Sequence, residues 1–303
     1  MSNLGALSVL TFANGARFAG AFSSTVPAEA RRAEQERAAA LAEEEEAQLA
    51  AAVAASLAVQ PGSSDAAQLQ STVLRVSDVS AVDHGMLSPV RGVSRAPLLP
   101  LMDAANATGV EDIDAYAYMA VEKGKRVVQS SLNEYGLTVD EAGALALYTM
   151  ESGLYGTLNK LLSNHDRSVL KPFFGYMRLL LDARGKLPAF KGVVWRGVRE
   201  DLRSKFAKGA EIFWWAFSST TKEVSTLRNP AFLGTEGVRT QFLIEVDAGV
   251  DLEHYSIYQG EASEAEVLLY PGTKLLVVDV TDLGSSLFQV HLRQLPVPVQ
   301  LFA

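Results

Sequence analysis

Two glutamates, Glu264 and Glu266, are separated by a single residue. They precede a short apolar run at 267–269, and Pro271-Gly272 follows that run. The run reads as a short buried strand followed by a turn. Because side chains alternate along a strand, residues two apart share a face, so both carboxylates are expected to point the same way. Two carboxylates held side by side repel, and such a pair is typical of a place where a cation or a developing positive charge lies between them. The spacing therefore predicts a site.

Two earlier stretches carry residues that could serve the same chemistry. Arg196 ends the apolar run Val193-Val194-Trp195 and is followed by Gly197. Arginine captures phosphate through a planar fork of donors, and glycine lets a ligand approach the backbone. Further on, an aromatic run ending at Phe217 breaks into four hydroxyl residues, 218–221. Alone, the first stretch also fits a solvated arginine at a strand end, and the second fits a strand that runs into a Ser/Thr turn.

The elements that must position these residues change in type along the chain. Helical patterns cover 110–134, 139–163 and 168–184, with Asp140 as the expected cap of the helix that enters Glu141. Only strand-like runs follow, at 193–195, 212–218, 241–246, 264–269, 274–280 and 287–292. Helices first and strands later predict an α+β domain with a mostly antiparallel, twisted double sheet. Gly-rich dinucleotide and P-loop fingerprints are absent, so a nucleotide would have to be held differently.

The order of these pieces resembles that of a known enzyme class. With Arg196, then Phe217-Ser-Ser219-Thr-Thr, then Glu264-x-Glu266, residues 104–303 resemble mono-ADP-ribosyltransferases of the arginine–serine–glutamate class. That class includes vertebrate arginine-specific ectoenzymes and many bacterial toxins. The resemblance implies an ADP-ribosyltransferase-like fold, helical at first and then a β-sandwich. It also implies NAD as the substrate that supplies ADP-ribose, without a metal.

The resemblance also implies roles for the catalytic residues. Arg196 would hold the phosphates and ribose of NAD, and the hydroxyl of Ser219 would orient Glu266, with Thr221 in place of the usual last serine. Breaking the nicotinamide–ribose bond builds a positive charge on the ribose, which the fixed carboxylate of Glu266 would stabilise, as in glycoside cleavage. Glu264 would face the guanidinium of an arginine acceptor.

The NAD-binding set implied by the resemblance is Tyr155, Asn159, Arg196, Gly197, Ser219, Thr220 and Phe232. Gly197 would meet the nicotinamide amide through its backbone, and Tyr155 and Asn159 lie one helical turn apart. Phe232 could stack on nicotinamide or simply anchor the core. Residues 254–258 match an acceptor-recognition loop by position, Glu261 is expected in a loop, and Trp195, Trp214 and Trp215 are expected in the core.

The N-terminal third of the chain differs from the rest in composition and in its predicted elements. Residues 1–25 predict a hairpin around Asn14-Gly15 that resembles half of a MORN repeat. Residues 26–60 predict an acidic, alanine-rich helix whose stripe of Leu49, Ala52, Val53, Ser56 and Leu57 follows Glu43-Glu-Glu-Glu46. The stripe resembles a ubiquitin-interacting motif, although Val59 stands where an acid is usual and Ala47-Gln48 separate the acids from Leu49. The alternative is a solvated helix. Residues 61–103 read as a linker to a domain at 104–303.

Composition limits the other partners. The net charge of −8 without a basic patch argues against nucleic acid. The chain has no cysteine, and its four histidines lie far apart, which argues against a metal site. No apolar run approaches the roughly 18 residues that span a membrane, and no basic segment begins a signal peptide. A cytoplasmic protein is expected, with secretion as an effector left open.

Three functions follow from these observations. The first is transfer of ADP-ribose from NAD to a protein arginine, with recruitment by ubiquitin. The second is NAD glycohydrolysis, in which water replaces the arginine. The third is a ubiquitin-binding interaction module with an inactive transferase fold, against which the intact triplet of Arg196, Ser219 and Glu266 argues.

Overall fold

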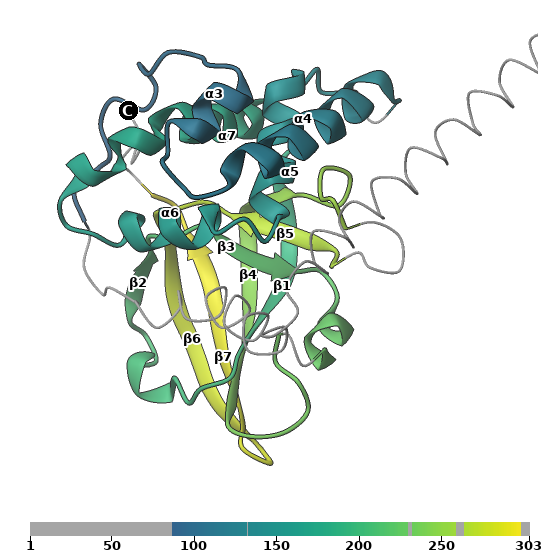
Figure 1. Ribbon diagram of the computed structural model, residues 1–303. Helices are drawn as coiled ribbons and strands as arrows, with labels where there is room; N and C mark the ends of the chain where they lie inside the picture. Colours follow the sequence, from purple (N-terminus) through teal and green to yellow (C-terminus); the bar gives the residue numbers. More distant parts are fainter. Residues whose placement is uncertain (1–86, 132, 230–231, 259–263, 298–303) are drawn as a thin grey trace, which may run out of the picture. The chain divides into compact units, whose positions relative to one another are not determined.

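The computed structural model of the chain describes residues 87–131, 133–229, 232–258 and 264–297 (Figure 1). The predicted hairpin, the predicted ubiquitin-binding helix and the linker up to residue 86 lie outside these residues. The rest of the predicted linker packs against the domain, because Leu87, Val90 and Val93 are buried in the same apolar cluster as α3 (Leu101–Asn106). The packed part of the domain therefore begins before residue 104.

Helices come first in the described chain. After α3 follow α4 (Ile113–Gln129), α5 (Val139–Thr149), α6 (Leu154–Leu162), the 3-10 helix η1 (Arg167–Phe173) and α7 (Phe174–Lys186). The cap of α5 differs from the prediction: the Thr138 hydroxyl accepts from the Glu141 amide at 3.2 Å, and the Glu141 carboxylate accepts from the Thr138 amide at 2.7 Å. Asp140 instead accepts from the amide of Leu101 at 2.7 Å, at the start of α3. Asp140 as the cap of α5 was a wrong prediction.

The single helix predicted over 139–163 is two helices. Met150 is extended (ψ 148°) and ends α5, and Gly153 has a left-handed φ of 71° directly before α6. Both sides of the break bury apolar side chains, such as Leu147 and Leu154. Buried apolar residues therefore flank the break on both sides, and the short polar stretch that ends in Gly153 marks it.

The strands follow as β1 (Phe190–Val198), β2 (Glu211–Trp214), β3 (Ser218–Thr221), β4 (Arg239–Asp251), β5 (Glu266–Leu269), β6 (Thr273–Gly284) and β7 (Leu287–Leu295). Short 3-10 helices, η2 (Arg203–Lys205) and η3 (Val224–Arg228), lie between them. In the described chain they form one sheet in the order β1-β3-β5-β4-β7-β6-β2, in which only the β4–β7 pair is parallel. The prediction of an α+β domain with a mostly antiparallel sheet is confirmed. The predicted double sheet was wrong, because the described strands pair into one sheet.

The strand predicted over 212–218 is two strands in different parts of the sheet. β2 pairs with β6 at one edge, whereas β3 pairs with β1 and β5. Between them, Trp215 and Phe217 are buried against the helices. The segment 215–217, where the chain crosses from β2 to β3, is apolar like the interior of a strand. The sequence therefore gives no sign that one strand ends there and another begins.

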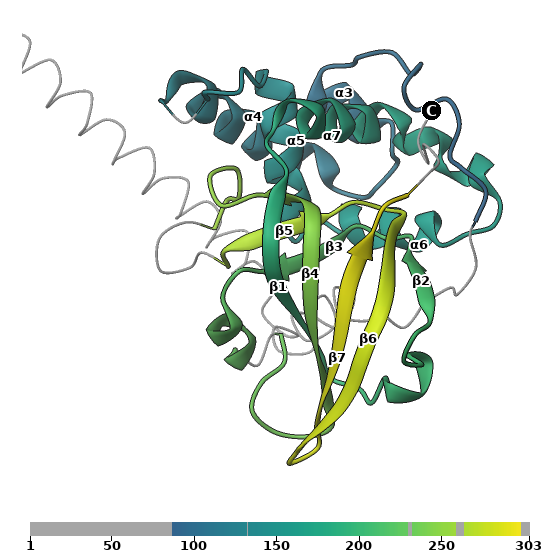
Figure 2. The same cartoon turned by 180° about the vertical axis from the view of Figure 1, so that it is seen from behind.

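The sheet closes on itself at one end. β1 pairs with β4 as well as with β3, so β1, β3, β5 and β4 form a ring, whereas β7, β6 and β2 extend from it as an open sheet. Figure 2 shows β1, β4, β7 and β6 running side by side. We call the first group the closed end of the sheet and the second the open end.

Two apolar cores hold these layers. One lies between the helices and the sheet and includes Tyr176, Phe217 and Tyr270. The other is built by side chains on the inner strand faces, such as Val194, Phe242 and Leu292. Helices α3, α4, α5 and α7 lie together beyond one end of the strands (Figure 1). Within the described ranges, no helix is long and apolar enough to cross a membrane.

Candidate active site

Ser219 and Glu266 meet because of the register between β3 and β5. Thr221 lies opposite Glu266, and Ser219 lies opposite Leu268. Directly opposed residues share a face and diagonal neighbours are within reach, so the side chains of Ser219 and Glu266 are on one face of the sheet. The Ser219 hydroxyl donates to the Glu266 carboxylate, whose residue is only 3% exposed. The carboxylate is therefore fixed in a place that water hardly reaches.

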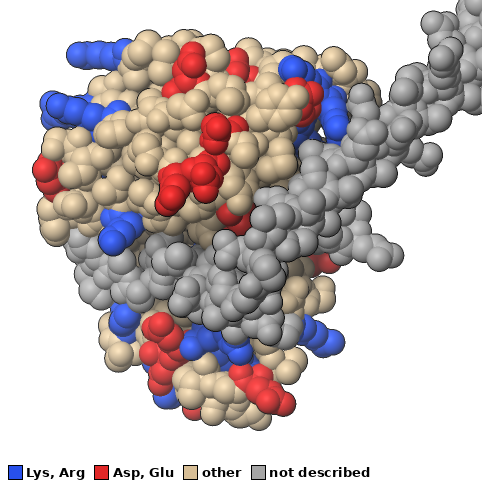
Figure 3. Space-filling model, in the orientation of Figure 1, with Lys and Arg blue, Asp and Glu red and all other residues tan. Residues whose placement is uncertain are grey.

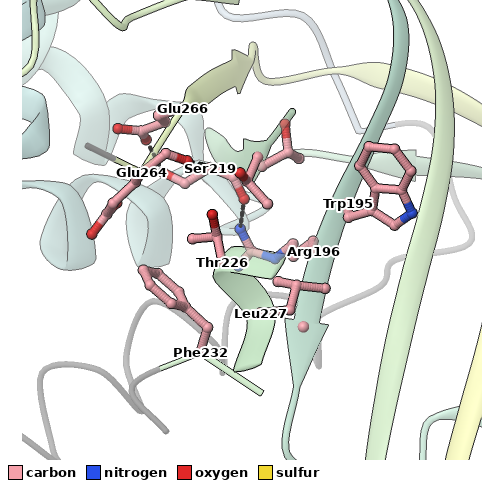
Figure 4. A pocket seen from close by; sticks show the side chains of 11 residues that line it. Trp195, Arg196, Ser219, Thr226, Leu227, Phe232, Glu264 and Glu266 are labelled. Carbon is pink, nitrogen blue, oxygen red and sulfur yellow. Dashed lines mark hydrogen bonds between the residues drawn. The ribbon is translucent and has the colours of Figure 1, made fainter. Parts of the chain in front are cut away.

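Arg196 reaches the same residue from β1. Its guanidinium donates to the Ser219 carbonyl at 2.8 Å, and the residue is 7% exposed. Figure 4 shows the guanidinium directed toward Ser219 while the Trp195 indole points away from it, as alternation along β1 requires. Ser219 thus touches a buried cation through its carbonyl and a buried carboxylate through its hydroxyl. The predicted triplet of Arg196, Ser219 and Glu266 lies together in the folded chain.

Glu264 also faces this site, but for a different reason than predicted. β5 begins at Glu266, and Ala265 has a φ of 45°, in the left-handed region. This conformation costs about 1–2 kcal/mol for a residue other than glycine. Strand alternation from 264 to 266 was therefore a wrong prediction. Glu264 nevertheless lines the same pocket as Glu266, and Figure 4 shows the two side chains side by side.

A pocket opens in front of these side chains. Its wall is formed by Trp195, Arg196, Gly197, Ser219, Thr220, Thr221, Thr226, Leu227, Phe232, Glu264 and Glu266, and we call it the glutamate pocket. Thr226 and Phe232 come from η3 and the loop after it, and their side chains face the space in front of Arg196 (Figure 4). The Phe232 ring is only partly buried, so it borders the pocket rather than anchoring the core.

Gly197 has a packing role in this wall. A Cβ atom at position 197 would lie 2.6 Å from the Cβ of Leu233, closer than any real contact. Leu233 is buried, and its amide and that of Gly234 donate to the Leu227 carbonyl, so the loop that carries Phe232 is tied down at this point. Gly197 is thus required for the loop to lie against β1, whatever its backbone does toward a ligand.

Arg196 also borders a second depression. Tyr148, Tyr155, Asn159, Arg196, Phe217 and Ser219 line it, and we call it the tyrosine pocket. Arg196 and Ser219 line both pockets, so the two pockets adjoin at these residues. The predicted pair of Tyr155 and Asn159 does lie beside the triplet.

Asn159 makes two structural hydrogen bonds that the sequence does not reveal. Its amide nitrogen donates to the Phe217 carbonyl at 3.0 Å, and its amide oxygen accepts from the Phe217 amide at 2.9 Å. The residue is 3% exposed. Asn159 therefore fixes the backbone directly before β3, where Ser219 stands two residues later.

Thr220 and Thr221 use their hydroxyls on neighbouring backbone. The Thr220 hydroxyl donates to the Val267 carbonyl at 2.6 Å, and that of Thr221 donates to the Glu264 carbonyl at 2.7 Å. Thr220 borders the glutamate pocket, but its hydroxyl is occupied by β5. Both threonines hold the β5 strand and the residues before it against β3.

Other predicted contacts lie elsewhere. Trp214 and Trp215 are buried in the two cores, as predicted. The same prediction was wrong for Trp195, which is only partly buried and borders the glutamate pocket. Tyr255, in the stretch matched to an acceptor loop, is also buried, and burial raises the pKa of its hydroxyl. Glu261 lies outside the described residues. In the described part of the chain, no group of three or more histidine, aspartate or glutamate side chains could hold a metal ion.

Sequence reasoning missed several residues of the site. Thr226 and Leu227 line the glutamate pocket from η3, and Tyr148 and Phe217 line the tyrosine pocket. No spacing or residue type marked the first two, because a short 3-10 turn has no long pattern. The Tyr148 and Phe217 rings lie 5.5 Å apart, and the position of Phe217 directly before the hydroxyl run was the available signal.

Comparison with known proteins shows which known fold the chain shares. No protein-family model and no curated protein sequence matches the chain. Among solved structures, the type III effector XopAI from Xanthomonas axonopodis pv. citri, with a 70-residue N-terminal truncation, is 12% identical with a TM-score of 0.50, over 78% of this chain and 100% of its own.

Two ADP-ribosyltransferases match at lower TM-scores. The Vis toxin from Vibrio splendidus is 20% identical with a TM-score of 0.42, over 60% of this chain and 86% of its own. The eucaryotic mono-ADP-ribosyltransferase ART2.2, in complex with NADH, is 14% identical with a TM-score of 0.48, over 65% and 85%. The chain thus shares the fold of XopAI, which it matches over the whole of the XopAI chain.

Proposed function

We propose that the chain is a mono-ADP-ribosyltransferase that moves ADP-ribose from NAD to the guanidinium of a protein arginine. The observation that carries the proposal is the double contact of Ser219, whose carbonyl accepts from Arg196 and whose hydroxyl donates to Glu266. Ser219 thereby holds two groups in one site. The Arg196 guanidinium would bind phosphate, and the Glu266 carboxylate would stabilise a developing positive charge. The order of these residues in the sequence supports the same reading.

The two pockets support a long, doubly charged substrate. NAD carries a pyrophosphate between two nucleosides, and the buried Arg196 lines both the glutamate pocket and the tyrosine pocket. A guanidinium fork binds phosphate oxygens well, because its donors are planar and its charge is permanent. The nicotinamide end would lie toward Glu266 and Phe232, and the rest of the molecule toward Tyr155.

Glu266 would assist cleavage of the nicotinamide–ribose bond. In this step the carbon–nitrogen bond breaks, its electron pair leaves with nicotinamide, and positive charge builds on the ribose ring. A carboxylate that is already desolvated and bonded to Ser219 stabilises that charge without having to reorganise. Fixed groups of this kind contribute about 3–4 kcal/mol each to lowering a barrier.

Glu264 would serve the acceptor. A guanidinium nitrogen forms the new bond to the ribose carbon and gives up a proton, which the Glu264 carboxylate can accept. Glu264 is partly exposed, whereas Glu266 is buried, so an acceptor from outside can reach the first and not the second. In the glycohydrolase alternative, water forms that bond and Glu264 has no guanidinium to hold.

Recruitment by ubiquitin is a separate part of the proposal and rests on the sequence. The stripe of Leu49, Ala52, Val53, Ser56 and Leu57 would lie in an apolar groove of ubiquitin, with the acids at 43–46 beside its basic residues. Titration of the full chain into isotope-labelled ubiquitin should shift ubiquitin resonances, and Ala52→Arg should remove the shifts. Unchanged spectra with the unsubstituted chain would end this part of the proposal and leave the enzyme untouched.

The experiment that tests the enzyme follows two products at once. The full chain is incubated with adenine-labelled NAD and polyarginine, and free nicotinamide and acceptor-bound label are measured together. The proposal expects both products, with bound label lost in Glu264→Gln while nicotinamide release continues. Nicotinamide without bound label would indicate the glycohydrolase. Neither product, from folded protein, would contradict the proposal and favour an inactive interaction module.

A further inference from the structure

The backbone between the two glutamates is held from both sides. The Glu264 carbonyl accepts from the Thr221 hydroxyl at 2.7 Å, the Ala265 carbonyl accepts from the Lys222 amide at 2.9 Å, and the Glu266 carbonyl accepts from the Leu252 amide at 2.9 Å. Three successive carbonyls are therefore bonded to the ends of β3 and β4. Neighbouring structure that fixes every carbonyl in this way can keep a residue in an unfavourable conformation.

The residue kept in that way is Ala265. Its φ of 45° is left-handed, and the residue is only 9% exposed. A single left-handed residue changes the direction of the chain, so the side chain before it no longer follows the alternation of the strand after it. Without it, regular pairing would continue the β5 strand back through Glu264.

The two glutamates depend on this residue to different degrees. Glu266 is fixed on its own account by its pairing with Thr221, by the Ser219 hydroxyl and by the Leu252 amide. Glu264 precedes the left-handed residue, and its carbonyl is held by the Thr221 hydroxyl. A change in the conformation of Ala265 therefore moves Glu264 more than Glu266.

We infer that Ala265 is a positioning residue whose left-handed conformation, clamped by Thr221 and Lys222, aims Glu264 at the acceptor and so sets the ratio of transfer to hydrolysis. The inference rests on the proposed transferase function and names a control over its outcome. In transfer, the acceptor nitrogen bonds to the ribose carbon and its proton goes to Glu264. In hydrolysis, a water oxygen bonds to the same carbon, and its proton goes to solvent.

Paired substitutions of similar size separate conformation from bulk. Ala265→Asn tolerates the left-handed region, whereas Ala265→Val, which is β-branched, resists it. Thr221→Val removes the hydroxyl that holds the Glu264 carbonyl, and Thr221→Ser restores it. If Ala265→Val is insoluble, the threonine pair decides alone. Thermal unfolding of each variant checks that it is folded.

The readout is the ratio of polyarginine-bound label to released nicotinamide, measured on the full chain. We expect this ratio to fall by about tenfold to a hundredfold in Ala265→Val and Thr221→Val, the size typical of a misplaced group. Ala265→Asn and Thr221→Ser should stay within about threefold of the unsubstituted chain. The inference would be overturned if both products fell together in these variants. It would also be overturned if the ratio were the same within each pair of variants while the unsubstituted chain transfers normally. Either result would leave the proposed transferase function standing.

Failure of the proposed function gives a different result. If the unsubstituted chain releases no nicotinamide, the enzyme proposal fails. If it releases nicotinamide without labelling polyarginine, the transferase proposal fails. Both results are seen before any variant is made, and each also removes the inference.

Discussion

Both ends of the sheet bury apolar side chains, such as Val194 and Val290, but they differ in the charged and polar side chains that they bury. At the closed end, Arg196, Thr220, Thr221 and Glu266 are all at most 7% exposed. At the open end, the inner face is apolar, with residues such as Val277 and Val290, and the charges lie outside. There Lys208 pairs with Asp279 at 3.0 Å and Lys274 with Glu211 at 2.6 Å, and Figure 3 shows acidic and basic side chains mixed on this part of the surface.

Charged side chains at the two ends differ in what they contribute. An exposed ion pair adds little, because water and salt screen it. A buried charge is costly, so its position is set by the hydrogen bonds that compensate the lost water. At the closed end these bonds come from main chain and hydroxyls of neighbouring strands, as for Arg196 on Ser219. The closed end thus holds the residues of the proposed active site.

The largest effect is expected at the centre of the closed end. Glu266→Gln keeps the shape of the side chain but removes the charge that would stabilise the ribose cation. Nicotinamide release should fall by about 10²–10³-fold, as for other fixed electrostatic groups. Release within a few-fold of the unsubstituted chain would show that the buried carboxylate is not the catalytic group.

A smaller effect, on stability, is expected from Asn159→Leu. The substitution leaves the Phe217 amide and carbonyl buried without their side-chain partners. The free energy of unfolding should fall by about 2–4 kcal/mol, since each unsatisfied buried group costs about 1–3 kcal/mol. Denaturant unfolding measures it. A change under about 0.5 kcal/mol would mean that α6 does not hold the start of β3.

The matched substitution at the open end should do almost nothing. Glu211→Gln removes one charge of the pair with Lys274, in which the Glu211 side chain is 54% exposed. The free energy of unfolding, measured in the same way, should change by about 0.5 kcal/mol or less. A loss as large as that of Asn159→Leu would remove the contrast between the two ends.

The smallest effect concerns pH at the outward faces of β4 and β7. The hydrogen bond from Arg293, followed by that involving His291, holds the pKa of Glu245 below its ordinary value. Because the folded pKa is lowered, the contribution to stability is present above the ordinary carboxylate range and is lost as pH falls through the folded pKa. In an NMR titration, Arg293→Gln should raise the midpoint of Glu245; an unchanged midpoint would contradict this cause.

The order of elements and the meeting of the triplet could be predicted from the sequence, whereas details of backbone could not. Helix and strand types follow from periodicity, and three pieces in a known order indicated one site. The break at Gly153 was missed because buried apolar residues flank it on both sides, and the crossing at 215–217 was missed because apolar residues continue through it. The left-handed Ala265 was missed because its conformation is imposed by β3 and β4, which are distant in sequence.

The most direct test of the account is a double-mutant cycle on nicotinamide release with Ser219→Ala, Glu266→Ala and the double variant. If the Ser219 hydroxyl acts by holding Glu266, its removal should cost about tenfold alone and almost nothing once the carboxylate is gone, as for residues that act as a unit. If the two losses multiply in the double variant, the hydroxyl and the carboxylate act independently, and the account of a single NAD-cleaving site at the closed end is wrong.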